Sequence, residues 1–188
     1  LAVSPDGRKV YVAQRTSPAR GAVAVVHVAR RRVLSTTVEA EGVPRSVVAS
    51  PDGRRIYVAV DGVGVRVMDA AVATVLGTIA TPLGDGALDN PQGLAISPDG
   101  TLLAASDGLP GGAVGVWRTA DRGLQARLVM PAGQAPLGVV FAADGERAWV
   151  VAADTTGLQT ATLRSFDPLT GAAQAPLAVG ALPTGIAV

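Results

Sequence analysis

The sequence predicts an all-β protein built from four similar antiparallel units, and three observations lead to that fold class. The phrase Ser-Pro-Asp-Gly occurs three times, and a worn fourth copy keeps only Asp-Gly. The four aligned aspartates, Asp6, Asp52, Asp99 and Asp144, are 46, 47 and 45 residues apart. The segments between them are short, rich in Val, Ile and Ala, and separated by Gly and Pro, which is typical of strands and tight turns.

The second repeat shows how each unit is expected to fold. Its apolar segments predict four antiparallel strands, named A to D, at residues 46–49, 55–60, 65–69 and 75–80. In the other repeats the expected C strands are 23–27, 114–118 and 163–167, and the D strands begin near Val33, Leu124 and Ala173.

The repeated Ser-Pro-Asp-Gly phrase is interpreted as the turn between strands A and B. Proline fixes φ at the first central position of a turn, the Asp side chain can cap backbone N–H groups, and Gly supplies a positive φ. A catalytic role for these aspartates would require four equivalent active sites in one chain. The phrase therefore predicts architecture rather than chemistry.

Repeated four-stranded units of this length are typical of a β-propeller, in which each unit is a blade around a central channel. The expected blades are 1–43, 44–90, 91–135 and 136–182, with the start of a fifth at 183–188. Residues 182–188 align with 90–96, which lead into an A strand, and residues 1–3 match the tail of the same strand. We therefore expect four blades of a six- to eight-bladed ring, and the alternative is a closed four-bladed ring.

Two stretches of the sequence resemble a known repeat. SPDGRRIYVAV and the following VRVMDAAVATVLGTIATPLG are similar to the YVTN-type β-propeller repeat. The third repeat departs from that pattern, with Ala104 in place of the tyrosine and Arg118 in place of the C-strand aspartate, and the fourth lacks Ser-Pro. Seven-bladed propeller lactonases share these features, so the resemblance implies the fold and, as an alternative function, lactone hydrolysis.

The composition excludes several classes of function. A hydrophobic content of 48% with 16% charged residues indicates a globular protein with a packed core. The net charge of +1 gives no general basic field, so nucleic acid is not an expected partner. No apolar run approaches the roughly 20 residues of a membrane span, so none is expected. The absence of Cys does not decide the compartment, but the chain begins with Leu1, and an exported location, periplasmic or on the cell surface, is favoured over a cytoplasmic one.

Binding of a protein, a surface polymer or a small molecule is expected on the face that carries the B–C and D–A loops. The C-strand aspartate position follows the turn serine position by 23, 19, 21 and 25 residues, so the B–C loops vary in length, and the longest D–A segment is 82–90. Seven carboxylates against three arginines give this loop face a charge of −4, which disfavours anionic ligands, and the turn face has +2. The alternative is that these charges serve only solubility.

One position of the repeat is the strongest candidate for ligand contact. It lies between the proline and the A strand, and its residues differ although their neighbours repeat: Arg45, Gln92, Leu137 and Thr184. Further candidates on the loop face are Asp85, Asp89, Asn90, Asp107 and Asp154. Three of these, at 85, 89 and 90, could offer oxygen ligands to Ca²⁺, but their spacing matches no EF-hand loop, and a Gly/Asp turn is favoured. No cofactor is therefore expected.

The remaining motifs favour structural roles. His27, the only histidine, stands at the C-strand aspartate position and is expected to make a local turn contact. Arg30, Arg31 and Arg32 fall in a C–D turn and are interpreted as a solvated turn rather than a phosphate site. No G-x-S-x-G, H-E-x-x-H or P-loop motif is present, so no catalytic residue is assigned. The first hypothesis is a non-enzymatic recognition module, and the alternative is a propeller lactonase-like hydrolase.

Overall fold

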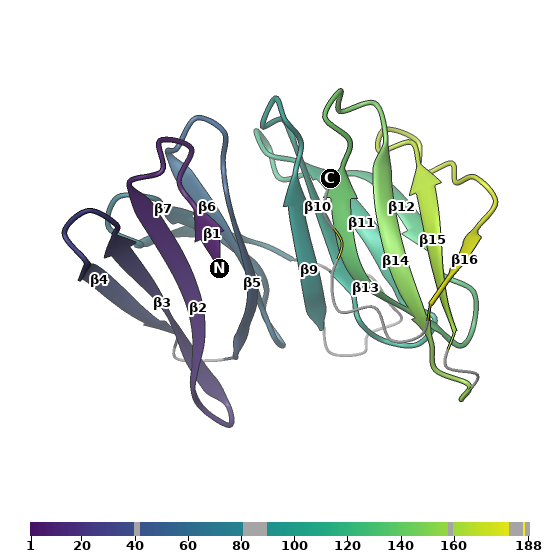
Figure 1. Cartoon of the computed structure of the whole chain (residues 1–188), viewed down its shortest axis with the longest axis horizontal. Helices are drawn as coiled ribbons and strands as arrows, with labels where there is room; N and C mark the ends of the chain where they lie inside the picture. The colour runs from purple at the N-terminus through teal and green to yellow at the C-terminus, as the bar shows by residue number, and fades with distance from the viewer. Residues whose placement is uncertain (40–41, 81–89, 158–159, 181–185, 187–188) are drawn as a thin grey trace. The chain divides into compact units, whose positions relative to one another are not determined.

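The computed structural model describes residues 1–39, 42–80, 90–157, 160–180 and 186, and its strands form four antiparallel sheets of four strands each (Figure 1). The described residues contain no helix. Accordingly, none of them belongs to a helix long and apolar enough to cross a membrane. Within every sheet the strands pair in chain order, so each sheet is a simple meander. The all-β fold class is confirmed.

Each sheet is a blade. Blade 1 consists of β1 (Ala2–Val3), β2 (Lys9–Ser17), β3 (Arg20–His27) and β4 (Arg32–Glu39). Blade 2 consists of β5 (Pro44–Ala49), β6 (Arg55–Val60), β7 (Gly64–Asp69) and β8 (Val75–Ile79). Blade 3 consists of β9 (Pro91–Ile96), β10 (Leu102–Asp107), β11 (Ala113–Arg118) and β12 (Leu124–Val129). Blade 4 consists of β13 (Gln134–Phe141), β14 (Ala148–Asp154), β15 (Ala161–Phe166) and β16 (Leu177–Val179).

The strands predicted for the second repeat agree with blade 2 to within two residues at every end. The D strand of the fourth repeat was expected near Ala173, and its pairing with the C strand does begin there, through a bridge between Phe166 and Ala173. This bridge has the register of the first C–D pairs in the other blades, such as Val26 with Val33. The continuous strand β16 begins only at Leu177.

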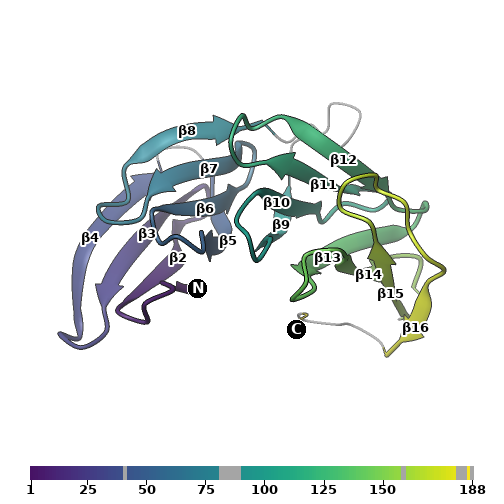
Figure 2. The same ribbon diagram turned by 90° about the horizontal axis from the view of Figure 1, so that it is seen from above.

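The chain divides into two compact units, and the first contains blades 1 and 2. Inside it, β2 of blade 1 contacts β5 of blade 2, and Figure 2 shows these two strands side by side. The apolar faces of both sheets meet in one buried cluster that includes Tyr11, Ile56 and Met68. The Tyr11 hydroxyl donates a 3.0 Å hydrogen bond to the Ala70 carbonyl oxygen, so the same side chain packs the two blades and ties them together.

The second unit contains blade 4 and nearly all of blade 3. Its strands β10 and β13 are in contact, as β2 and β5 are in the first unit. The shared core includes Leu102, Phe141, Val150 and Phe166, all of them buried. In each unit, alternate residues of the strands point toward the neighbouring sheet, and their apolar side chains form the core that the two sheets share.

Candidate functional site at the two edges of the blades

The meander places the A–B and C–D turns at one edge of each sheet, called here the turn edge, and the B–C connections at the other, called the loop edge. The A–B connections are residues 4–8, 50–54, 97–101 and 142–147. The B–C connections are residues 18–19, 61–63, 108–112 and 155–160. The first set is nearly constant in length and the second varies, as the sequence predicts.

The A–B turns are held by a serine network that the sequence analysis did not identify. In blade 2 the Ser50 hydroxyl donates to the Asp52 carboxylate and accepts a 2.9 Å hydrogen bond from the Arg55 backbone N–H. Asp52 Oδ1 accepts a second bond, of 3.0 Å, from the Arg54 N–H. Blades 1 and 3 repeat these contacts at Ser4 and Ser97, and all three serines are buried. The Ser-Pro-Asp-Gly turns of blades 1 to 3 therefore satisfy the hydrogen bonds of their own polar side chains.

The same network shifts the titration of the turn aspartates. The hydrogen bond from the serine hydroxyl is the largest cause that lowers the pKa of Asp6, Asp52 and Asp99 below the ordinary value of 3.8, and the backbone N–H two residues on is the next. These carboxylates are thus stabilised as anions by their own turns. Groups held in this way are poor candidates for proton transfer, in line with their interpretation as architecture.

The fourth A–B turn keeps the backbone geometry without the serine. Ala142 N–H still donates to the Arg147 carbonyl oxygen at 2.8 Å, and Gly145 N–H to that of Ala142 at 2.9 Å. Asp144 Oδ1 still accepts from the Glu146 N–H. Gly145 has a φ of +74°, close to the +68° of Gly53, so both lie where a side chain is strained. The glycine and the aspartate suffice to form this turn.

The C–D turns also satisfy their own polar groups, by more varied chemistry. Asp69 Oδ1 accepts hydrogen bonds from the Ala71 and Val72 N–H groups, at 2.8 and 3.1 Å. His27 Nδ1 accepts one from the Arg30 N–H at 3.3 Å, so the predicted local turn contact of the histidine is confirmed.

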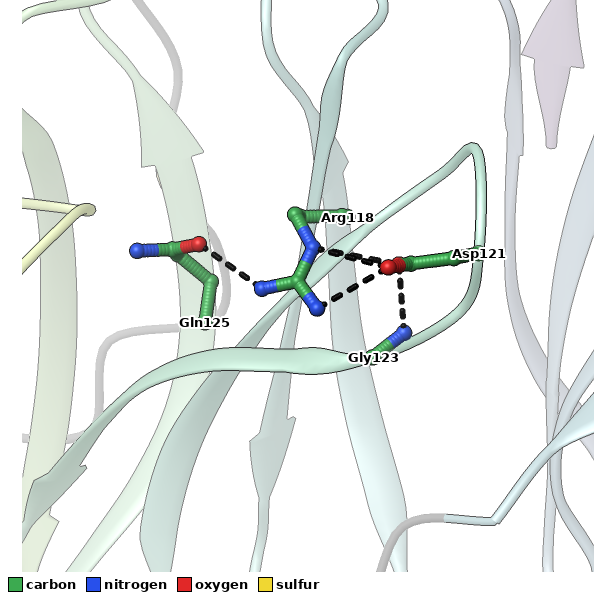
Figure 3. Close-up of polar contacts among 4 residues, drawn as sticks. All are labelled: Arg118, Asp121, Gly123 and Gln125. Atoms are coloured by element: carbon green, nitrogen blue, oxygen red, sulfur yellow. Dashed lines mark hydrogen bonds and ion pairs between the residues drawn. The ribbon is translucent and has the colours of Figure 1, made fainter.

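In blade 3, Arg118 stands where Asp69 stands in blade 2. Here the strand residue is the hydrogen-bond donor, and the carboxylate is supplied by the turn. The Arg118 guanidinium contacts the Asp121 carboxylate from Nε and Nη2 and donates to Gln125 Oε1 at 3.0 Å, while Asp121 also accepts the Gly123 N–H (Figure 3). The carboxylate has moved three residues along the turn but still caps a backbone N–H. An exposed pair of this kind contributes little to stability.

Arg45, a predicted ligand residue, lies at a β-bulge on the loop edge. Pro44 pairs with Val60 and Ser46 with Ala59, so Arg45 is the extra residue of β5. Its guanidinium binds the Asp61 carboxylate of the adjacent B–C connection, with Nε–O distances of 2.9 and 2.8 Å. The Arg45 side chain is 41% exposed, so the pair lies at the surface.

Leu137 has the same placement in blade 4. Pro136 pairs with Ala152 and Gly138 with Val151, so the register shifts at Leu137 as it does at Arg45. Bulges bend a strand and re-aim the extra residue's side chain, and they occur often beside functional sites. The sequence analysis did not anticipate the bulge at Arg45, because the A strand of the second repeat was expected to begin only at residue 46.

The other predicted residues have several fates. Gln92 is half-buried in β9, and its side chain fills the space beside Gly108. Asn90 is half-buried just before β9. Thr184, Asp85 and Asp89 lie outside the described residues, as does the long D–A segment that carries the last two.

The two loop-edge aspartates of the second unit have different surroundings. Asp107 ends β10 and is buried, with 4% of its surface exposed. Asp154 accepts hydrogen bonds from the Thr156 N–H and hydroxyl, which are the largest causes that lower its pKa, and a longer one from the Thr160 hydroxyl. Asp154 thus holds its own B–C loop.

Each unit has a recess at its turn edge, between the A–B turns of its two blades. In the first unit the recess measures about 190 Å³, and Asp6, Lys9, Tyr11 and Asp52 line it. In the second unit a recess of about 340 Å³ is bordered by Asp99, Thr101, Asp144, Glu146 and Leu169, among others. Throughout the described part of the chain, no three His, Asp or Glu side chains are grouped so as to hold a metal ion.

Comparison with known proteins identifies the fold. No family model matches the chain, and no curated protein matches it either. Among solved structures, a chain of hydrazine synthase from Kuenenia stuttgartiensis superposes with a TM-score of 0.74 at 23% sequence identity. The match covers 88% of this chain and 49% of that one, so the chain spans about half the length of its structural relative. Together with the four meander sheets, this likeness shows that the fold is that of a β-propeller.

Proposed function

We propose that the chain is a non-enzymatic recognition module, which binds a protein, a surface polymer or a small ligand through the loop edge of its blades. The observation that carries this proposal is the bulge in the first long strand of blades 2 and 4. It falls at the same position of the repeat, and the side chains there are unlike, Arg45 and Leu137. A backbone bulge that recurs at one position of the repeat and presents unlike side chains is suited to recognition, because the contacts change while the scaffold does not.

The contrast with the turn edge supports this assignment. At the A–B turns the repeated side chains hydrogen-bond one another and the backbone, so those polar groups are already used. At the loop edge the connections differ in length from blade to blade. Variable connections on a rigid scaffold are the usual place for binding residues.

Arg45 is the residue of this edge with the clearest chemistry for a ligand. Asp61 holds the guanidinium with both carboxylate oxygens, so its orientation is set before any ligand arrives. An exposed ion pair contributes at most about 1 kcal/mol to stability, so its replacement by a ligand costs little. Arg45 would thus serve as a donor to a carbonyl, hydroxyl or carboxylate of the ligand.

The described side chains of the loop edge have a net charge of zero, whereas the count from the sequence is −4. Among residues whose side chains are described, the loop edges of the two units together carry three arginines, at 15, 20 and 45, and three aspartates, at 61, 107 and 154. The surplus of negative charge comes from Glu39, Glu41, Asp85 and Asp89, whose side chains lie outside that set. Because these four carboxylates give the loop edge its net negative charge, neutral or cationic ligands are favoured there.

The resemblance to YVTN-type repeats belongs to the same proposal, and it also raises the alternative of lactone hydrolysis. Hydrolysis of a lactone needs a base or a metal-activated water and stabilisation of an oxyanion. The distinguishing experiment uses the full-length protein with gluconolactone, with and without a divalent-metal chelator. If the protein hydrolyses gluconolactone and the chelator abolishes that hydrolysis, the chain is a metal-dependent lactone hydrolase and the recognition proposal is wrong.

The binding arm of the experiment uses a neutral glucan, an amino-sugar oligomer and a phosphorylated sugar as probes, at low and high salt. We expect saturable binding of at least one probe that Arg45→Gln weakens and Arg118→Gln leaves unchanged, since Arg118 is likewise an exposed arginine paired with a carboxylate but lies on the turn edge. Both variants should melt at the wild-type temperature, since both arginines are exposed. Failure of every probe to bind, or equal losses in both variants, would contradict the loop edge as the site.

A further inference from the structure

The turn edges of the two units carry opposite charge. In the first unit seven basic residues stand at or beside the turns, against the three aspartates Asp6, Asp52 and Asp69. The basic residues are Arg8, Lys9, Arg30, Arg31, Arg32, Arg54 and Arg55, called here the basic edge. In the second unit three arginines face five carboxylates. The surplus of four positive charges is thus a property of blades 1 and 2 and not of the repeat.

The four turns of the basic edge are fixed to one another. In blade 1 the Val28 N–H donates to the Arg8 carbonyl oxygen at 2.9 Å, and in blade 2 the Ala70 N–H donates to that of Arg54 at 3.0 Å. Lys9 Nζ then donates from blade 1 to the Ala70 carbonyl oxygen of blade 2 at 3.3 Å. The arginines of both blades therefore extend from one continuous edge.

The guanidinium groups of this edge extend into solvent. The six arginines are exposed, and within the described structure none of their side chains makes a hydrogen bond or an ion pair. The three aspartates nearby are turned to their own turns, where Asp6 and Asp52 accept from serine hydroxyls and Asp69 from backbone N–H groups. Arg8, Arg54 and Arg55 add only a minor coulombic stabilisation to the turn aspartates, so the guanidinium groups remain available for an external anion.

Aliphatic side chains project from the same turns. Val28 and Val72, in the C–D turns of blades 1 and 2, are 45% and 54% exposed, and Val33 at the start of β4 is 56% exposed. The two tyrosines of these blades, Tyr11 and Tyr57, are buried. An edge of arginines and valines without exposed aromatic rings offers nothing for bases to stack on.

We propose that the basic edge docks the protein on a membrane surface rich in anionic phospholipid. Lipid phosphates would be bound by the protruding arginines, and the valines at the turn tips would enter the headgroup layer. The recess between the A–B turns carries Asp6 and Asp52, so an acidic peptide could not seat a carboxylate there without repulsion. A flat anionic surface avoids that recess because it touches only the tips. This docking is independent of the loop-edge function proposed above, which lies at the opposite edge of the same blades.

The test is co-sedimentation of the full chain with vesicles of equal parts phosphatidylcholine and phosphatidylglycerol, and with phosphatidylcholine alone. Binding is expected to the anionic vesicles, and it should weaken as salt is raised. The double variant Arg30→Gln/Arg31→Gln should bind them about tenfold or more weakly, since each basic residue near such a surface contributes about fivefold. The matched control Arg15→Gln/Arg20→Gln removes the same charge from the loop edge and should change binding less than about twofold.

Three outcomes would overturn the proposal. The first is absence of binding to the anionic vesicles at low salt. The second is an equal loss in both double variants, which would show that net charge and not the basic edge is responsible. The third is tighter binding to a DNA duplex or to polyglutamate than to the vesicles, which would assign the edge to another class of partner. Equal melting temperatures of the two double variants, whose substituted residues are all exposed, keep the comparison valid.

Discussion

The two units share one backbone plan but fill it with different side chains. In the first unit Tyr11 of blade 1 packs in a cluster with Ala49 of blade 2. In the second unit the aligned residues are Ala104 and Phe141, so the large side chain has moved to the other blade. The turn edges differ in the same way, being basic in the first unit and acidic in the second. The two units thus share the same strands and turns, while the side chains at aligned positions differ in size and charge.

The comparison of cores gives the largest expected effect. Phe141→Ala removes a buried ring and should lower the free energy of unfolding by about 3–5 kcal/mol. Ala104→Tyr alone should overpack the same cluster and cost about 1–3 kcal/mol. The double variant, which copies the first unit, should be more stable than the sum of the two losses predicts by more than about 1 kcal/mol. Urea unfolding of all three variants measures this coupling. If the two losses are strictly additive, a large side chain at one position does not fill the space vacated at the other.

The serine turns give the next effect. Ser50→Ala removes the acceptor of the Arg55 N–H and the donor to Asp52, so we expect a loss of about 1–2 kcal/mol. The reverse change, Ala142→Ser, should give the fourth turn the missing contacts and stabilise it by about 0.5–1 kcal/mol. Denaturant unfolding tests both, and a destabilising Ala142→Ser would mean that the fourth turn has lost the geometry for the network.

Acid should reduce the effect of Ser50→Ala. The pKa of Asp52 is lowered in the folded state, so the unfolded state binds protons first as pH falls, and stability is lost below about pH 4. The hydroxyl of Ser50 is the main cause of that lowering. The difference in unfolding free energy between wild type and Ser50→Ala should therefore be largest above about pH 5 and shrink as Asp52 becomes protonated. A difference that stays constant from pH 6 to about pH 2 would contradict the contact.

The C–D turns give the smallest effect. Arg31, Ala73 and Arg122 have φ values of +48°, +57° and +63°, and Gly171 occupies the corresponding place in blade 4 at +76°. Because Arg31 is exposed and glycine tolerates this region, Arg31→Gly should stabilise the fold by about 0.5–1 kcal/mol. Thermal unfolding is the measurement, and Gly171→Ala should show the opposite sign. The same Arg31→Gly change should weaken vesicle binding, which separates stability from docking.

The sequence predicted the parts of the fold that repeat. The period of the Asp-Gly pairs located the A–B turns, and the apolar segments located most strands to within a few residues. In blade 4 the pairing of the D strand begins at Ala173 as expected, but the continuous strand β16 begins only at Leu177. Residues that recur in every repeat predict the architecture well, because each copy must satisfy the hydrogen bonds of the same backbone groups.

The candidate site was less predictable. Arg45 and Leu137 could be chosen because they differ where their neighbours repeat, but their bulges are defined by pairing with the neighbouring strand, which the sequence alone does not show. The residues of the basic edge were expected on the turn face, but the turn-face total of +2 did not show that the positive charge belongs to blades 1 and 2. The whole-chain charge of +1 concealed it, because the second unit compensates for the first.

We propose that the repeated positions build the scaffold and that recognition lies with the positions that vary. Gly53→Val tests it most directly, because Gly53 has a φ of +68° in a repeated turn and is remote in sequence from the bulge in blade 4. We expect thermal unfolding to report a loss of about 1–3 kcal/mol, while the folded fraction binds the sugar probes as tightly as wild type. An unchanged melting temperature with lost probe binding would contradict the account, since it would place recognition at the turn itself.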